Sequence, residues 1–225
     1  MAPRDFRTRL TRRAAKAGLY PSDGVIERLI AYYELLARWN KKINLTALDN
    51  PDEAIDRLLL EPIAATRHLR PADIHQLDIG SGGGSPAIPM KLVIPGLNLT
   101  MVEVKARKSA FLREAIRQLE LDHTSVETER YEELLARPEL HERFDFLSVR
   151  AVRVEARVLM SLQAFVRSGG HVLLFRGPSG PEAPATLVPP LEWMGTYPLI
   201  DGLQSRLTVL SKLSLGHAVF HVEQS

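Results

Sequence analysis

The stretch LDIGSGGGSPAIP, from Leu77 to Pro89, constrains the fold of this chain more than any other part of its sequence. An apolar run opens it, four of the five residues 80–84 are glycine, and prolines follow at Pro86 and Pro89. Glycines after a strand let the backbone turn tightly and admit a nucleotide-like ligand to contact distance. Prolines suit the first turn of a helix, where a missing N–H costs little. The stretch therefore predicts a strand, a ligand-binding loop and a short helix, which Pro95 and Gly96 end.

Short apolar runs alternate with helix-length stretches through the middle of the chain. The runs are QLDIG, LTMVEV, FDFLSV and HVLLFRG, and the longer stretches include Lys105–Glu120 and Val154–Arg167. This alternation is typical of a parallel sheet with crossover helices, in which ligands bind at the carboxyl ends of the strands. After a Pro-rich loop, the runs WMGTYPLI, SRLTVLSKL and GHAVFHV predict closing strands with an antiparallel pair. We therefore expect an α/β, Rossmann-like sheet that is mostly parallel and has an antiparallel C-terminal strand.

The first seventy residues predict helices. One apolar stripe recurs with helical spacing at Ile26, Leu29, Ile30, Tyr33 and Leu36. A second helix begins at NPDEA, where an asparagine suited to the N-cap precedes a proline. We therefore divide the chain into an N-terminal helical extension, residues 1–70, and a second domain, residues 71–225.

Composition excludes several classes of protein. The chain has no cysteine, which excludes disulfides, thiolate metal sites and a cysteine nucleophile. No metal-ligand spacing stands out, and no apolar run approaches the roughly 20 residues of a membrane helix. Nor does the N-terminus have an apolar leader. We therefore expect a cytoplasmic monomer that binds neither metal nor membrane.

The net charge is only +2, but the cations are clustered. One cluster spans Arg4–Lys16 and another spans Lys105–Arg113. Such clusters neutralise phosphates in nucleic-acid-binding proteins. The alternative is a solvated helix face or, for the first cluster, a mobile tail.

Glu103 follows the strand run LTMVEV and lies 23 residues after Gly80. A carboxylate about 20 residues after the first glycine of such a loop bonds ribose hydroxyls. The alternative is an acid that faces the N-terminus of the next helix. We favour ribose binding, because one carboxylate can accept from both hydroxyls.

The loop does not match the common nucleotide-binding patterns. Ser85 stands where G-x-G-x-x-G requires its third glycine, and G-x-x-x-x-G-K-[ST] is absent. A ligand with adenosine but no pyrophosphate fits better, and we infer S-adenosylmethionine. Two other classes remain open, an NAD-dependent oxidoreductase and an RNA-binding module without activity.

Five segments together resemble a known family. WNKKINLTAL, LDIGSGGGSPAIP, VEVKARKSAFL, ERYEEL and VRAV, in this order, resemble the bacterial small-subunit (16S) ribosomal RNA guanine-N7 methyltransferases, once named glucose-inhibited division protein B. The resemblance spans about Tyr33–Gly177. It implies a Rossmann-like methyltransferase domain after N-terminal helices, S-adenosylmethionine as cofactor, and 16S ribosomal RNA or the small ribosomal subunit as partner.

The resemblance and the loop pattern together assign site residues. The expected cofactor contacts are Gly80, Gly82, Gly84, Ser85, Glu103, Tyr131, Glu132 and Arg150, the last also suited to positioning the methionine carboxylate or the target base. The expected RNA contacts are Arg107, Lys108, Asn44 and Arg176. Several positions depart from the family pattern, namely Leu58, Glu61, Ala87, Arg176 and His217, and most of these affect RNA contact. Guanine N7 carries a free lone pair, so the resemblance implies in-line methyl transfer without a general base.

Overall fold

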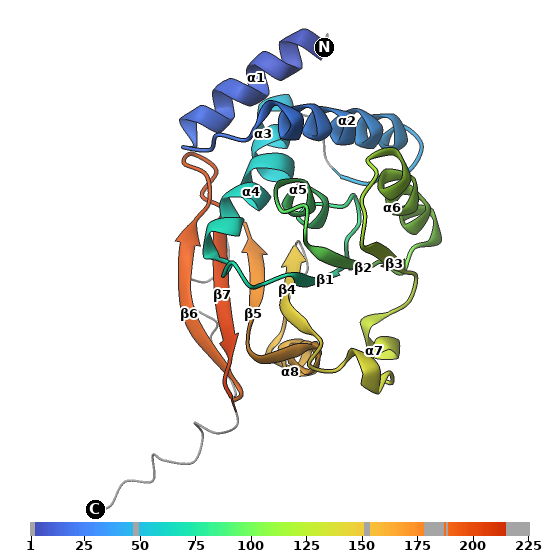
Figure 1. Ribbon diagram of the computed structural model, residues 1–225, viewed down its shortest axis with the longest axis vertical. Coiled ribbons are helices and arrows are strands. Elements are labelled where there is room, and N and C mark those ends of the chain that lie inside the picture. The colour runs from blue at the N-terminus through green and yellow to red at the C-terminus, as the bar shows by residue number, and fades with distance from the viewer. Residues whose placement is uncertain (1–2, 47–49, 151–153, 178–186, 188, 215–225) are drawn as a thin grey trace, which may run out of the picture.

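A seven-stranded sheet forms the centre of the protein in the computed structural model, which describes residues 3–46, 50–150, 154–177, 187 and 189–214 (Figure 1). The strands are β1 (His75–Ile79), β2 (Asn98–Val102), β3 (Thr124–Glu127), β4 (Phe144–Arg150), β5 (Val166–Arg176), β6 (Leu191–Pro198) and β7 (Arg206–Lys212). Their order is β3-β2-β1-β4-β5-β7-β6. Strands β1 to β5 pair in parallel, and β7 pairs antiparallel with both β5 and β6. The predicted fold class is confirmed.

Helices cover both faces of this sheet. They are α1 (Pro3–Lys16), α2 (Asp23–Asn40), α3 (Pro51–Ile55), α4 (Glu61–Ala65), α5 (Ala87–Val93), α6 (Ala106–Gln118), α7 (Tyr131–Leu134) and α8 (Ala156–Leu162). A π-helical turn, Asp56–Leu60, joins α3 to α4, and a 3₁₀ turn, Thr66–His68, follows α4. As expected, α5 is short and ends just before Pro95.

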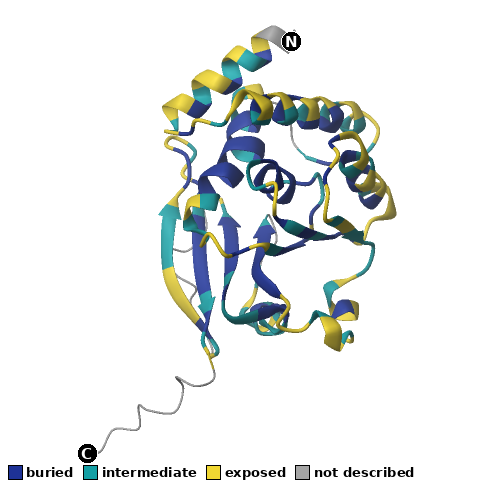
Figure 2. Cartoon of the chain, in the orientation of Figure 1, coloured by how far each residue is buried: buried dark blue, intermediate teal, exposed yellow. Residues whose placement is uncertain are grey.

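Alternate strand residues enter two separate hydrophobic cores, because successive side chains of a strand point to opposite faces. On β4, Phe146 belongs to the core under α1, α2, α5 and α6, whereas Leu147 and Val149 belong to the core under α7 and α8. The strands in the middle of the sheet are buried, and the edge strand β6 is partly exposed (Figure 2). The carboxyl ends of β1, β2, β4 and β5 therefore meet at one edge of a sheet that is covered on both faces.

The N-terminal helices pack onto the same core as α5 and α6. The cationic run of α1 contributes to this packing through ion pairs. Arg7 pairs with Asp23, and Arg13 pairs with the buried Asp56 through two hydrogen bonds. The run is therefore part of the folded helical layer rather than a mobile tail. The division at residue 70 stays a prediction.

Some expectations fall outside the described residues. These are the run GHAVFHV with His217, the last two residues of VRAV and most of the Pro-rich loop. Among the described helices, none combines the length and the apolar character needed to cross a membrane.

Candidate cofactor site

The glycine loop leaves β1 in a conformation that needs glycine. The φ angles of Gly80, Gly82 and Gly84 are 72°, 53° and 87°, in the left-handed region that L side chains rarely adopt. A Cβ on Gly84 would also lie 2.5 Å from the Cδ1 of Ile88. The amides of Gly80 and Ser81 both donate to the carbonyl of Val102 on β2. These bonds hold the loop against the ends of two strands.

Two residues of α2 fix the loop and the segment that covers it. The hydroxyl of Tyr32, which is fully buried, donates to the carbonyl of Gly83 at 2.6 Å. The Asn40 side chain accepts from the amides of Leu45 and Thr46 and donates to the carbonyl of Thr46. The segment that follows α2, with Leu45 and Thr46, therefore lies beside the glycine loop, although the two are far apart in the sequence.

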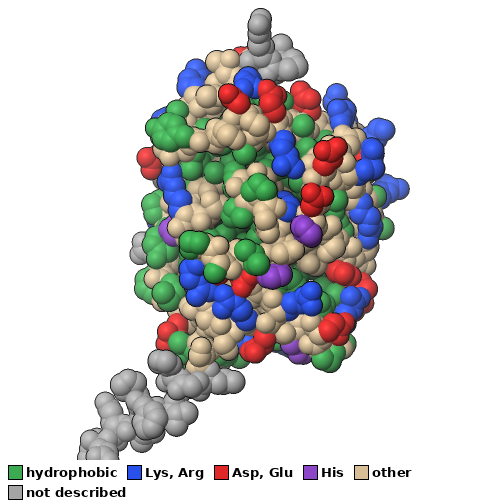
Figure 3. All heavy atoms as spheres, in the orientation of Figure 1, with side chains coloured by type: hydrophobic (Ala, Val, Ile, Leu, Met, Phe, Trp, Pro, Cys, Tyr) green, Lys and Arg blue, Asp and Glu red, His purple; other side chains and the backbone are tan. Residues whose placement is uncertain are grey.

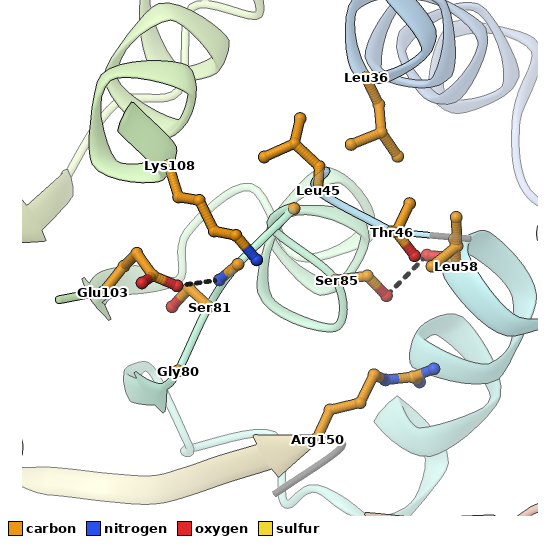
Figure 4. A pocket seen from close by; sticks show the side chains of 12 residues that line it. Leu36, Leu45, Thr46, Leu58, Gly80, Ser81, Ser85, Glu103, Lys108 and Arg150 are labelled. Atoms are coloured by element: carbon orange, nitrogen blue, oxygen red, sulfur yellow. Dashed lines mark hydrogen bonds between the residues drawn. The ribbon is translucent and has the colours of Figure 1, made fainter. Parts of the chain in front are cut away.

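A cavity of about 250 Å³ opens between these segments (Figure 4). Its lining comes from α2 and the segment after it, the π turn, the glycine loop, the first turn of α6, and the ends of β2 and β4. The lining residues are Leu36, Leu45, Thr46, Leu58, Gly80, Ser81, Gly82, Gly83, Ser85, Glu103, Lys108 and Arg150. Five of the predicted cofactor contacts, Gly80, Gly82, Ser85, Glu103 and Arg150, thus meet in one place.

Glu103 is buried where β2 meets this cavity. One carboxylate oxygen accepts from the Gly82 amide at 3.0 Å, and the other accepts from the Lys105 amide at 2.9 Å. Each carboxylate oxygen has more than one acceptor site, so these bonds leave capacity for ribose hydroxyls. The same bonds also tie the loop to the start of α6, so both readings of Glu103 have a structural basis.

Asp78 is a buried carboxylate that the sequence analysis did not single out, and it is not among the residues that line the first cavity. It lies on β1, two residues before Gly80, and is buried. One of its carboxylate oxygens accepts from the Ser148 hydroxyl, and the other has no partner among the described residues. Burial raises the pKa of Asp78 to about 6, although the bond from Ser148 and the charge of Arg150 oppose this. Its signal in the sequence was an acid inside an otherwise apolar strand run.

The π turn offers two backbone carbonyls to the site, because the helix is interrupted there. The Glu61 amide bonds to Asp56 rather than to Arg57, and Pro62 has no N–H to give to Leu58. The Arg57 carbonyl instead accepts from Nη1 of Arg150 at 2.7 Å. The Leu58 carbonyl accepts from the Ser85 hydroxyl at 2.9 Å (Figure 4). Ser85 and Arg150 are thereby anchored to the same turn.

Arg150 ends β4 and is mostly buried. Its Nη1 lies 2.9 Å from Oε2 of Glu61, and its guanidinium lies over the Phe175 ring, 4.6 Å from the centroid. Burial lowers the pKa of Arg150, and the Glu61 carboxylate opposes this shift. A second cavity, of about 350 Å³, adjoins the first and shares Thr46, Leu58 and Arg150 with it.

The remaining predicted residues differ in whether they line these cavities. Gly84 does not line the first cavity, and neither do Tyr131 and Glu132, which begin α7 after the neighbouring strand β3. Their cofactor roles stay predictions. Lys108 lines the first cavity, and Arg107 beside it is exposed.

Two predicted RNA contacts flank the cavities from other elements. Asn44 is exposed, next to the lining residue Leu45. Arg176 lines the second cavity, where burial lowers its pKa. Within the described part of the chain, no three His, Asp or Glu residues are placed to hold a metal ion.

Comparison with known proteins decides the family. A model of the rRNA small subunit methyltransferase G family matches residues 25–183. The chain belongs to this family. A ribosomal RNA small subunit methyltransferase G from Carboxydothermus hydrogenoformans is 37% identical over 169 residues, which are 75% of this chain and 72% of that relative. Membership in the methyltransferase G family confirms the predicted resemblance and favours a methyltransferase over an oxidoreductase.

Solved structures share the fold at low sequence identity. A SAM-dependent methyltransferase from Aquifex aeolicus superposes with a TM-score of 0.54 at 14% identity, over 80% of this chain and 98% of that chain. The putative methyltransferase yhhF from Escherichia coli gives a TM-score of 0.56 at 13% identity, over 68% of this chain and 86% of that one.

The residues of the first cavity fit S-adenosylmethionine. A loop in the left-handed conformation leaves room beside the strand ends, and the Glu103 carboxylate suits a ribose.

Proposed function

We propose that the protein transfers the methyl group of S-adenosylmethionine to N7 of a guanine in 16S ribosomal RNA. One observation carries this proposal. In a member of the rRNA small subunit methyltransferase G family, the glycine loop, Glu103 and Arg150 line one cavity at the carboxyl edge of the sheet. The small ribosomal subunit is the proposed partner, and the cytoplasm is the proposed location.

The side chains of the cavity divide the work of binding. Glu103 accepts from the ribose hydroxyls while it continues to hold the Gly82 amide. Gly82 and Gly83 expose backbone where side chains would fill the cavity, and Leu36, Leu45 and Leu58 provide an apolar wall. Arg150, anchored by Glu61 and by the Arg57 carbonyl, presents its remaining donors at the junction of the two cavities.

The chemistry requires placement rather than proton transfer. When bound, the cofactor supplies a methyl group attached to a sulfonium sulfur, and this sulfur keeps the electron pair of the C–S bond that breaks. Guanine N7 has a lone pair that is free at neutral pH, so no residue needs to remove a proton. Fixing the base in line with the methyl group contributes at most about 7–11 kcal/mol through lost reactant freedom. Rigid anchoring of Ser85 and Arg150 serves this requirement.

Methyl transfer to ribosomal particles tests the proposal. The protein is incubated with S-adenosylmethionine labelled in its methyl group, together with small subunits from cells that lack this modification, and the labelled base is mapped. We expect label on N7 of one guanine in 16S RNA and none with Gly82→Val, whose side chain is strained at φ 53°. Folding of that variant is checked by circular dichroism. Label on another atom or on another RNA would overturn the assignment, and binding of NAD in preference to S-adenosylmethionine would overturn the cofactor.

A further inference from the structure

The second cavity has an unusual polar lining. Glu61 Oε1, Arg150 Nε, Arg150 Nη2, Arg176 Nε and Ser205 Oγ are buried atoms of lining residues, and none has a hydrogen-bond partner among the described residues. A buried polar atom without a hydrogen-bond partner destabilises the folded protein, because it has lost its bonds to water. Several such atoms around one cavity therefore indicate a site completed by a polar ligand.

The strand order places this cavity on the acceptor side of the cofactor. Along the carboxyl edge, Glu103 follows β2, the glycine loop follows β1, Arg150 ends β4 and Arg176 ends β5. A cofactor whose ribose lies at Glu103 extends from β2 towards β1. The second cavity lies beyond the loop, over β4 and β5, and meets the first cavity at Arg150.

The polar groups of the cavity match one nucleobase better than the others. A carboxylate accepts hydrogen bonds only, and a guanidinium donates only. Guanine presents two donors, N1–H and the 2-amino group, beside the acceptor O6, whereas adenine and cytosine each offer a single amino donor on that edge. When this edge is bound, N7 is left on the opposite side of O6, free of a donor.

We propose that the second cavity binds the target guanine by its Watson–Crick edge, with Glu61 accepting from N1–H and the 2-amino group and Arg176 donating to O6. This assignment rests on the proposed function and names the residues that make it specific for guanine. Arg150 holds the Glu61 carboxylate in place through the 2.9 Å ion pair and leaves Oε1 for the base. N7 then faces the junction with the first cavity.

Nucleotide binding tests this assignment without methyl transfer. The protein is saturated with S-adenosylhomocysteine, and binding of guanosine, inosine and adenosine monophosphates is measured by NMR titration. Inosine lacks only the 2-amino group. Loss of a hydrogen bond to a charged group corresponds to about 10- to 100-fold weaker binding. We therefore expect guanosine monophosphate to bind at least about 10-fold more tightly than inosine monophosphate, and adenosine monophosphate to bind weakest.

Matched variants show whether Glu61 is responsible. In Glu61→Gln the preference for guanosine over inosine monophosphate should fall to near 1. It should be kept in Glu53→Gln, which alters a half-exposed carboxylate on the same helical segment. Arg176→Met should weaken guanosine and inosine monophosphates equally, because both carry O6. Thermal melting confirms that each variant is folded.

The outcomes separate this inference from the proposed function. Equal binding of guanosine and inosine monophosphates to the unaltered protein overturns the base assignment, even if small subunits are methylated at guanine N7. An unchanged preference in folded Glu61→Gln also overturns it. A preference that depends on Glu61, in a protein that labels no guanine N7 in small subunits, supports the cavity and overturns the proposed function.

Discussion

Glu103 combines two tasks in one carboxylate, since it holds the loop through the Gly82 amide and faces the cofactor cavity. Glu103→Gln keeps the size of the side chain but replaces one acceptor oxygen with a donor. We expect affinity for S-adenosylmethionine to fall by about 1–2 kcal/mol, because the ribose hydrogen bonds weaken when the side chain loses its charge. Calorimetry measures this loss. Unchanged affinity would leave Glu103 only the task of capping α6.

The raised pKa of Asp78 predicts that stability and cofactor affinity depend on pH. Its pKa of about 6 lies above the ordinary value, so the folded protein binds a proton that the unfolded chain has already released. Its contribution to stability therefore falls as pH rises from about 4 to about 6 and is level above that range. A cationic cofactor favours the ionised form, so cofactor affinity should rise over the same range. Calorimetry at several pH values should show this rise in the unaltered protein and a flat profile in Asp78→Asn.

Sequence reasoning found the residues of this site that are marked by local spacing. Gly80, Gly82, Ser85 and Glu103 stand at fixed offsets within one strand–loop–helix–strand unit. Two residues were missed. Asp78 was missed although it is an acid inside an apolar strand run, and Tyr32 was missed because its partner is distant in the sequence. Tyr32 reaches the loop across 51 residues of chain, and it stands outside the predicted apolar stripe, which passes through Tyr33 instead.

At the scale of elements, the π turn before Pro62 is the feature that joins the helical layer to the site. The N-cap asparagine and the proline after it predicted a helix from Asn50 onward but not its interruption, because an interrupted hydrogen-bond ladder depends on which distant groups bond to the freed carbonyls. π turns inside helices occur often at functional sites. In this turn the freed carbonyls accept hydrogen bonds from the side chains of Ser85 and Arg150.

Pro62→Ala tests this arrangement. The new N–H can bond to the Leu58 carbonyl, which then competes with the Ser85 hydroxyl, so the helix becomes more regular and the site loses an anchor. We expect the melting temperature to be maintained or raised, because removing proline from a helix interior is favourable by up to about 3 kcal/mol. Methyl transfer should fall by about 10-fold, since small misplacements of aligned groups are costly. Full activity in a stabilised variant would show that the turn does not position the site.

Helix α6 carries the second cationic cluster along its first turns. Figure 3 shows Lys and Arg side chains gathered at the margin of the molecule where Figure 1 places α6. Arg107→Ala should lower the salt dependence of RNA binding by about 0.7–0.9 in log–log slope, the value of one phosphate contact. Cofactor affinity should stay unchanged, because Arg107 does not line the cavity.

The control for that variant lies on the same helix. Arg117→Ala removes an exposed cation that pairs with Glu114 at 2.7 Å near the other end of α6, and it should leave the slope unchanged. Equal slopes for all three proteins would make the start of α6 ordinary solvated surface. Lys108 is unsuitable for this comparison, because it lines the cofactor cavity.

For the whole molecule, the alternation of runs predicted a mostly parallel sheet with an antiparallel C-terminal strand, because parallel strands need crossover connections of helix length. It did not predict how closely the N-terminal helices join the sheet. Those helices share one core with α5 and α6, and Tyr32 and Asn40 hold the loop and its cover. Contacts between side chains far apart in the sequence determine this close packing, and the apolar stripe from Ile26 to Leu36 does not predict which contacts form.

Arg13 gives the last prediction, which concerns the stability of the whole protein. Arg13 pairs with Asp56, whose side chain is only 4% exposed, at the start of the π turn. Arg13→Ala leaves that carboxylate buried without its partner, so we expect the free energy of unfolding to fall by about 2–3 kcal/mol. Denaturant unfolding measures this. Arg12→Ala, at an exposed position of the same helix, should change it by less than about 0.5 kcal/mol. Cofactor affinity should fall in the Arg13 variant alone, because Asp56 begins the turn that anchors Ser85 and Arg150. Equal stability of the two variants would mean that the Arg13–Asp56 ion pair does not stabilise the fold, and that the loop keeps its shape without this pair.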